Sequence, residues 1–206
     1  MTETTTPRRR APAMSTEQRR EMIVAAALPL VADHGAAVTT SQIARAAGIG
    51  EGTIFRVFTD KDELLDACLV EAMNPGHVLR ELASISLDEP LADRLTQAAE
   101  ALRAHLGRMG TVIGALHGSG HRRERGSGDR PPGGREASMK ATREAIVELI
   151  EPDRASLRLE PGKVASVFLG MLFTRPLPAS GDLGSSPGEL VDVLLHGTLG
   201  TPGSPA

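Results

Sequence analysis

The sequence has no tryptophan and no tyrosine, and phenylalanine occurs only 4 times in 206 residues. Sandwiches and barrels of β-strands are usually rich in aromatic and β-branched residues, so this composition disfavours both. Alanine and leucine, which are strong helix formers, are abundant instead. We therefore predict an all-α protein, with either one domain or a small domain joined to a larger one.

Cysteine and long apolar runs are also scarce. The single cysteine, Cys68, cannot form an internal disulfide, and its place on the apolar face of a predicted helix over residues 61–73 predicts a buried, inert thiol. The best apolar candidate, residues 22–32, contains Pro29 and is shorter than the roughly 18 residues of a membrane span. The first residues are polar and arginine-rich, without the apolar run of a secretory signal. These absences predict a cytoplasmic protein that does not cross a membrane.

The chain is expected to begin with a basic arm and a long helix. Residues 1–15 contain Thr, Pro and Arg with little to bury, which predicts a disordered arm. Ser15 followed by Gln18 is typical of a helix start. Apolar residues then recur every three or four positions up to His34, so a helix is predicted to end there, kinked by Pro29.

Residues 39–58 carry the most informative pattern. Thr39 or Thr40 is expected to cap a short helix, and Gly48 to supply the positive φ that ends it. After a brief turn, a second helix is predicted over residues 51–58. Two short helices around a glycine turn, both packed on a longer first helix, form a helix-turn-helix.

Many residues at fixed spacing define this region and the start of the next helix. They are Thr39, Thr40, Ile43, Ala44, Ala47, Gly48, Gly52, Thr53, Phe58, Lys61 and Leu64, with near equivalents at Ile49, Ile54 and Phe55. The pattern resembles the DNA-binding signature of the TetR family of transcriptional regulators, T-T-x-x-I-A-x-x-A-G-V-S-x-G-T-L-Y-x-x-F-x-x-K-x-x-L. The resemblance covers residues 16–76, roughly the first third of the chain.

The resemblance implies an N-terminal three-helix DNA-binding domain, 16–76, and a C-terminal helical bundle, 77–200, for ligand binding and dimerisation. It further implies a homodimer whose recognition helices enter successive major grooves, about 34–36 Å apart, on a pseudo-palindromic operator. A ligand in the bundle would change that separation through the helix over residues 61–73. The expected function is a ligand-responsive transcriptional regulator, most often a repressor.

Roles for single residues follow from the geometry of a helix-turn-helix on DNA. The start of the second helix meets base edges, while flanking hydroxyls and basic side chains hold phosphates. The family places a tyrosine at Phe55, and phenylalanine cannot donate its hydrogen bond to a phosphate. The predicted DNA-binding residues are Thr40, Ser41, Glu51, Gly52, Thr53, Phe55, Arg56 and Lys61.

Three departures from the family pattern weaken the expected DNA contacts. Gly50 replaces a serine, Glu51 stands at an often basic position, and Val57 at an often histidine position. Glu51 repels phosphates unless it accepts a hydrogen bond from a cytosine N4 amine. Residues 1–66 contain 8 basic and 9 acidic side chains. Phosphate affinity is therefore expected to be modest and to depend on the arginine arm.

Beyond residue 76 the chain is similar to the family only in being helical. Apolar spacing predicts helices over about 91–109, 110–117 and 139–150. Residues 118–134 are rich in Gly, Arg, Ser and Pro, which predicts a mobile linker. Two late amphipathic helices, about 163–174 and 188–199, are predicted to form the homodimer interface.

A pocket between bundle helices is the expected ligand site, and its methionines suit an adaptable, unknown small apolar effector. The predicted lining is Leu102, His105, Met109, Ile113, His117, Met139, Ile146, Phe168 and Met171. Each of these side chains is also compatible with plain core packing. No metal and no other cofactor is expected.

Two other functions remain open from the sequence. The departures at Gly50, Glu51 and Val57 are compatible with a helical, small-molecule-binding dimer that has lost or weakened specific DNA binding. A small helical enzyme would use His105 or His117 and would show turnover or a bound metal, neither of which a regulator needs; we expect no enzyme. His117 and His121 have the spacing of a metal pair but straddle glycines, which favours solvated histidines.

Overall fold

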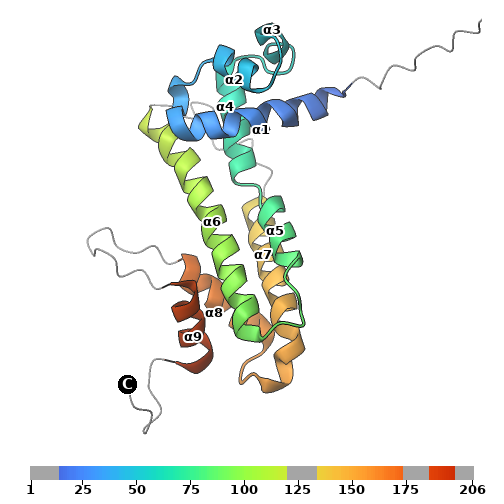
Figure 1. The fold of residues 1–206 in the computed structure, drawn as a ribbon, viewed down its shortest axis with the longest axis vertical. Helices are drawn as coiled ribbons and strands as arrows, with labels where there is room; N and C mark the ends of the chain where they lie inside the picture. Colours follow the sequence, from blue (N-terminus) through green and yellow to red (C-terminus); the bar gives the residue numbers. More distant parts are fainter. Residues whose placement is uncertain (1–13, 120–133, 174–185, 198–206) are drawn as a thin grey trace, which may run out of the picture. The chain divides into compact units, whose positions relative to one another are not determined.

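The computed structural model describes residues 14–119, 134–173 and 186–197, and over these ranges the chain is helical without a β-strand (Figure 1). The predicted all-α fold is confirmed. Contacts between residues divide the chain into two units, whose boundaries within the described residues fall after Ala72 and before Val112. Most of the arm, the linker and the Pro/Gly-rich loop before the last helix lie outside the described residues.

Unit 1 is built from the N-terminal helices and the end of α6. Its elements are α1 (Thr16–His34), η1 (Gly35–Ala37), α2 (Thr40–Ala46), α3 (Glu51–Ile54), α4 (Lys61–Ala72) and the part of α6 (Leu91–Gly118) from Val112 onward. A capping box of Ser15 and Gln18 opens α1, as predicted. The helix continues through Pro29 and packs on both α2 and α4.

The apolar face of α1 forms the core of unit 1 with α2, α3, α4 and α6. The buried residues are Ile23, Val24, Ala27, Val31, Val38, Ile43, Ala44, Ile54, Phe58, Leu64, Leu65, Cys68, Val112 and Leu116. Each fully buried Leu, Ile or Phe contributes about 1.5–3 kcal/mol of transfer free energy. The helix-turn-helix is therefore fixed from its inner side.

Gly35 allows the chain to turn sharply where α1 ends against α6. Its φ is +54°, and a Cβ atom there would lie 2.3 Å from the carbonyl oxygen of Ala115. The Ser119 hydroxyl accepts a hydrogen bond from the Ala36 amide at 2.6 Å. Only glycine combines this backbone conformation with so close an approach of another helix.

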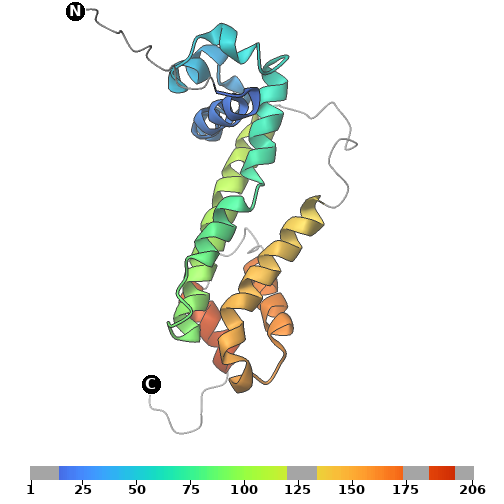
Figure 2. The same ribbon diagram turned by 90° about the vertical axis from the view of Figure 1, so that its right-hand side faces the viewer.

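Unit 2 is a helical bundle, seen from two sides in Figures 1 and 2. Its elements are α5 (Gly76–Ala83), the part of α6 before Val112, α7 (Gly134–Ile150), η2 (Glu151–Ser156), α8 (Pro161–Phe173) and α9 (Pro187–His196). Helix α7 packs on α5 and α8, and α8 packs on α9. Among the described residues, no helix combines the length and apolarity needed to span a membrane.

Three sequence predictions about helices need correction. Residues 91–118 form one helix instead of two, because burial on both sides of Gly110 outweighs its cost of about 1 kcal/mol. The short helix α5 was not predicted, since packing on α7 stabilises it more than its own sequence does. Helix α3 ends at Ile54 and not at Phe58.

The early end of α3 has a visible cause in its hydrogen bonds. The amides of Arg56 and Val57 bond the carbonyls three residues back, those of Thr53 and Ile54, at 3.3 and 2.9 Å. A tightened turn therefore replaces the last helical turn. Phe58 is nevertheless buried in the core of unit 1.

Candidate DNA-binding interface

The helix-turn-helix begins with a capping box. The Thr39 hydroxyl accepts a hydrogen bond from the Gln42 amide at 3.2 Å, and the Gln42 side chain accepts from the Thr39 amide at 2.8 Å. Of the two threonines that the sequence left open, Thr39 is therefore the cap. Gly48, two residues after the end of α2, has φ +66°, which confirms the prediction for this turn.

The predicted DNA-binding residues lie at the start of α2, along and just after α3, and at the start of α4. Ser41, Glu51, Gly52, Phe55 and Arg56 are exposed, whereas Thr40, Thr53 and Lys61 are partly buried. Ile54, on the opposite side of the short helix α3, is fully buried. One side of α3 is thus fixed in the core, and its other side is open to a partner.

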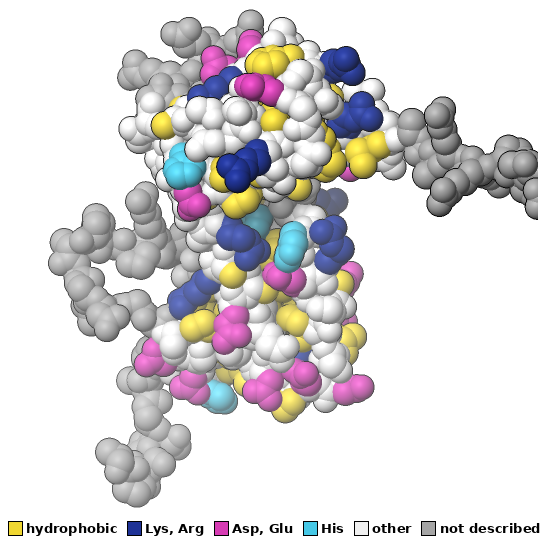
Figure 3. Space-filling view, turned by 45° about the horizontal axis from the view of Figure 1, so that its top comes forward, with side chains coloured by type: hydrophobic (Ala, Val, Ile, Leu, Met, Phe, Trp, Pro, Cys, Tyr) yellow, Lys and Arg dark blue, Asp and Glu magenta, His cyan; other side chains and the backbone are white. Residues whose placement is uncertain are grey.

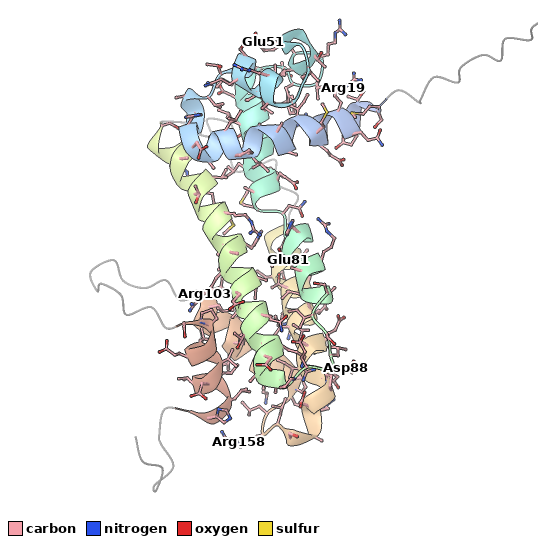
Figure 4. All side chains as sticks on the ribbon, in the orientation of Figure 1. Arg19, Glu51, Glu81, Asp88, Arg103 and Arg158 are labelled. Carbon is pink, nitrogen blue, oxygen red and sulfur yellow. The ribbon has the colours of Figure 1, made fainter. Side chains whose placement is uncertain are left out.

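Thr40 and Glu51 contact each other directly. The Thr40 hydroxyl donates a short hydrogen bond to Oε1 of Glu51, so the first residue of α2 is joined to the first residue of α3. Figure 4 labels Glu51 in this part of the unit. The sequence predicted both residues as DNA contacts but not the bond between them.

Lys61 also has a partner within unit 1. Its ammonium group donates a hydrogen bond to the Ala36 carbonyl oxygen at 2.5 Å, which joins the start of α4 to η1. An ammonium group has three donor hydrogens, so a phosphate contact by Lys61 stays a prediction.

Arg20 of α1 contacts Phe58, which follows α3, and Glu63 of α4. Sequence reasoning missed this role of Arg20. Its guanidinium lies 4.4 Å from the ring centroid of Phe58 and donates to Oε1 of Glu63 at 2.9 Å. The Thr59 amide donates to the other Glu63 oxygen at 2.7 Å. This amide bond and, second, Arg20 lower the pKa of the Glu63 carboxyl from its usual value. The sequence signal was a phenylalanine followed five residues later by a glutamate, Phe58 and Glu63, which together can hold an arginine.

Charges of both signs cover unit 1. Figure 3 shows acidic and basic side chains intermixed on the face it draws. In the described part of α1, the basic Arg19 and Arg20 are offset by Glu17 and Glu21. This distribution agrees with the even balance in the sequence and gives no continuous basic surface from these residues.

The predicted ligand-lining residues separate into several environments. Leu102, Ile146 and Phe168 are buried in the core of unit 2, and Met171 packs against that core. His105 and Met109 are partly buried, while Met139 is exposed. Ile113 and the exposed His117 are assigned to unit 1. The structure therefore brings together four of the nine in unit 2, and the ligand site stays a prediction.

Two titratable groups outside the helix-turn-helix, His105 and Cys68, have shifted pKa values. Burial, and then the positive charge of Arg108, lower the pKa of His105. Burial raises the pKa of the Cys68 thiol to about 12, which agrees with the predicted inert core cysteine. No group of three or more His, Cys, Asp or Glu side chains within the described ranges has metal-binding geometry.

Residues 23–68 match the family model of the bacterial regulatory proteins of the tetR family. The whole fold is similar to that of a protein from Mesorhizobium loti described as a TetR-family transcriptional regulator. The TM-score is 0.55 at 18% identity, covering 87% of this chain and 96% of that one.

A TetR transcriptional regulator from Streptomyces coelicolor is similar at a TM-score of 0.50 and 22% identity, covering 86% of this chain and 97% of that one. At these identities the two likenesses concern the fold. The matched segment contains α2 and α3 together with the core that holds them. Over residues 23–68, this chain therefore matches the tetR family of bacterial regulatory proteins.

Proposed function

We propose that this chain is a transcriptional repressor that binds a pseudo-palindromic operator as a homodimer and responds to a small apolar effector. DNA binding is assigned to residues 16–76, and dimerisation and effector binding to residues 77–200. The family match to residues 23–68 supports the first assignment. The proposed function consists of binding, without catalysis and without a cofactor.

One observation supports the DNA-binding role most directly: the start of α3 is exposed, while the same helix is packed into the core of unit 1. Glu51 and Gly52 face solvent, while Ile54 anchors the same helix in the core. Arg56 is exposed directly after α3 and supplies a basic side chain. In a helix-turn-helix this end of the second helix contacts base edges in the major groove.

Selection of bound sequences from random duplex DNA by the full chain tests this role. We expect a palindrome with half-sites about one helical turn apart. Arg56→Ala should weaken binding to the selected operator about 5- to 100-fold. Arg158→Ala, which changes an exposed arginine between η2 and α8 of unit 2, is the matched control and should bind normally. Failure of the wild-type chain to enrich any sequence would contradict the proposed function.

Apolar residues exposed on the last two helices support the homodimer. Val167 and Phe173 of α8 are 48% and 38% exposed, and Val193 of α9 is 38% exposed. Both helices bury their opposite faces in the core of unit 2. Large apolar residues left exposed on a helix pair favour association with a second copy.

A partly buried stretch of α6 supports effector binding to unit 2. Leu106 and Met109 are partly buried, and His105 beside them is held toward its neutral form. A neutral imidazole among apolar side chains can orient an apolar ligand that has one polar group. An effector is expected to weaken operator binding and to be bound less tightly by the operator complex, in the same ratio. Anisotropy titrations with and without operator measure both affinities.

A helical, small-molecule-binding dimer without specific DNA binding is the second candidate. The observation that favours it is the carboxylate of Glu51 at the start of the recognition helix, where phosphates of DNA would be repelled. This candidate predicts a stable dimer that enriches no DNA sequence. The selection experiment therefore separates the two functions.

A further inference from the structure

The hydrogen bond between Thr40 and Glu51 joins the two helices of the helix-turn-helix at their first residues. Thr39 already caps α2, so the Thr40 hydroxyl is not needed as a cap. It donates to Oε1 of Glu51 instead. Glu51 is exposed, and this bond restricts where its carboxylate can lie.

We propose that Thr40 positions the Glu51 carboxylate to accept a hydrogen bond from a cytosine N4 amino group, which selects a C·G base pair at one fixed position of each operator half-site. The inference rests on the proposed DNA-binding function and names the base that this site reads.

The chemistry of a carboxylate limits what Glu51 can contact on DNA. Ionised glutamate only accepts hydrogen bonds, and phosphate oxygens also only accept, so the two repel. The donors in the major groove are the amino groups of cytosine and adenine. Adenine carries the N7 acceptor beside its amino group, whereas cytosine presents no acceptor on its major-groove edge. Cytosine is therefore the base that a carboxylate favours.

The surroundings of Glu51 leave it open to a base edge. Gly50 and Gly52 flank it, and a Cβ atom added at either glycine would meet no heavy atom within 4 Å. Neither chain neighbour of Glu51 therefore carries a side chain, and Glu51 itself is exposed. The Thr40 bond occupies Oε1, and the carboxylate as a whole offers about four lone-pair sites, so Oε2 can accept from the base.

The role of Thr40 in this arrangement is to lower the entropic cost of binding. A free glutamate side chain loses rotamer freedom when it is fixed against a base. The bond from Thr40 restricts that freedom before DNA binds. The same bond uses the hydroxyl hydrogen that Thr40 would otherwise donate to a phosphate, so its contribution is to specificity more than to overall affinity.

Selection from random duplex DNA by full-length variants tests the inference. The wild-type chain should fix cytosine at one position of each half-site. Glu51→Ala should lower the preference for cytosine there about 5- to 100-fold and leave the other positions unchanged. Glu51→Gln should shift the preference to adenine, which an amide pairs in two hydrogen bonds. Thr40→Val should weaken the cytosine preference, and Thr40→Ser, which keeps the hydroxyl, should retain it.

A chemical change in the DNA gives a second, independent measurement. In the selected operator, that cytosine is replaced by the 2-pyrimidinone deoxynucleoside, which lacks the N4 amino group. The wild-type chain should lose affinity by the factor that Glu51→Ala loses on the natural operator. Combining the two changes should add no further loss, because both remove the same hydrogen bond.

Two outcomes overturn the inference, and they differ in what else they overturn. If Glu51→Ala binds all sequences more tightly without changing the preferred bases, Glu51 only repels phosphates, while the DNA-binding function stands. If the wild-type chain enriches no sequence, the proposed function fails together with the inference. The wild-type selection thus reports on the function, and its comparison with the variants reports on Glu51.

Discussion

A fully buried arginine, Arg94, links three segments of unit 2. It is 1% exposed, and its guanidinium donates a short hydrogen bond to Asp153 of η2 and another, at 3.3 Å, to the Leu87 carbonyl. Its Nε atom is buried without a described partner. Because Asp153 is about one-third exposed, loss of the pair affects the two residues unequally.

We predict that Asp153→Ala is more destabilising than Arg94→Met. The first change leaves a buried guanidinium without its counter-charge, which costs on the order of 3 kcal/mol of unfolding free energy. The second leaves Asp153, which water can reach, and keeps most of the buried volume, so a loss of about 1 kcal/mol is expected. Urea unfolding measures both. If both variants lost the same unfolding free energy, the ion pair with Asp153 would contribute little to stability beyond the packing of the Arg94 side chain.

Glu63 is expected to make stability depend on pH. The amide of Thr59 and the guanidinium of Arg20 lower its pKa in the folded chain below the usual 4.5. The group therefore stabilises the fold at pH values above the unfolded pKa. That contribution is lost as the pH falls through the folded pKa.

The matching measurement compares the melting temperatures of the wild type and Glu63→Gln between pH 7 and pH 3. We predict that the wild type melts higher at neutral pH and that the difference disappears on acidification. In an Arg20→Met background the difference should shrink but persist, since the Thr59 amide remains. A difference that is constant across this pH range would contradict a role for the charge of Glu63.

Sequence reasoning predicted the local role of single residues near the candidate site, but it did not predict which residues contact one another. Gly48 and the buried Cys68 were predicted correctly from local patterns. The bonds of Thr40 with Glu51 and of Lys61 with Ala36 depend on how separate segments pack. Periodicity along one helix contains no information about such contacts, so they could be found only in three dimensions.

At the scale of the helix, the glycines fall into two classes. Some lie so close to another segment that no side chain would fit, and others have open space where a side chain would lie. Gly35 has a positive φ and would bring a Cβ atom to 2.3 Å from a carbonyl oxygen. Gly110 and Gly114 lie inside α6, where an added Cβ would meet nothing within 4 Å. The two classes should respond to alanine in opposite directions.

We predict that Gly114→Ala raises the unfolding free energy by about 0.5–1 kcal/mol, because alanine restricts the unfolded chain and favours the helix. Gly35→Ala should lower it by more than 2 kcal/mol, since backbone strain adds to a clash with the Ala115 carbonyl oxygen. Gly48→Ala is the matched control, with φ +66° but open space, and should cost about 1–2 kcal/mol. A stable Gly35→Ala would show that α1 and α6 separate easily at this contact.

The predicted helices were accurate where a cap marked the boundary. Ser15, Thr39 and Gly48 fixed the ends of α1 and α2 to within a residue, because capping is a local interaction. Packing decided the other boundaries. Gly110 did not interrupt α6, and α5 forms although its sequence alone gave no prediction. Such elements depend on neighbours far away in the sequence.

For the whole molecule, the sequence could predict that a DNA-binding part precedes a helical bundle, but not which segments join each unit. The end of α6 contributes Val112 and Leu116 to the core of unit 1, although about 40 residues separate them from α4. The apolar pattern of α6 is the same on both sides of this division. Only the partners of each side chain distinguish the two parts.

At the scale of the whole molecule, homodimer formation is the property that can be tested most directly, because an operator palindrome requires two copies of the chain. Val167 and Phe173 of α8 and Val193 of α9 are the exposed apolar residues proposed to meet a second copy. Val167→Glu places a charge there, and burying it unpaired in an interface is strongly unfavourable. Sedimentation should therefore report a 21.7 kDa monomer for this variant, and twice that mass for the wild type.

Val70→Glu is the matched control, since Val70 is 57% exposed on α4 of unit 1 and should leave the dimer intact. A monomeric Val167→Glu chain still carries a complete helix-turn-helix, so it should bind one half-site as weakly as the wild type does. It should lose the additional affinity that the wild type has for the full palindrome, because one linked copy no longer raises the local concentration of the other. If Val167→Glu stays dimeric and binds the palindrome normally, the chain associates through another surface.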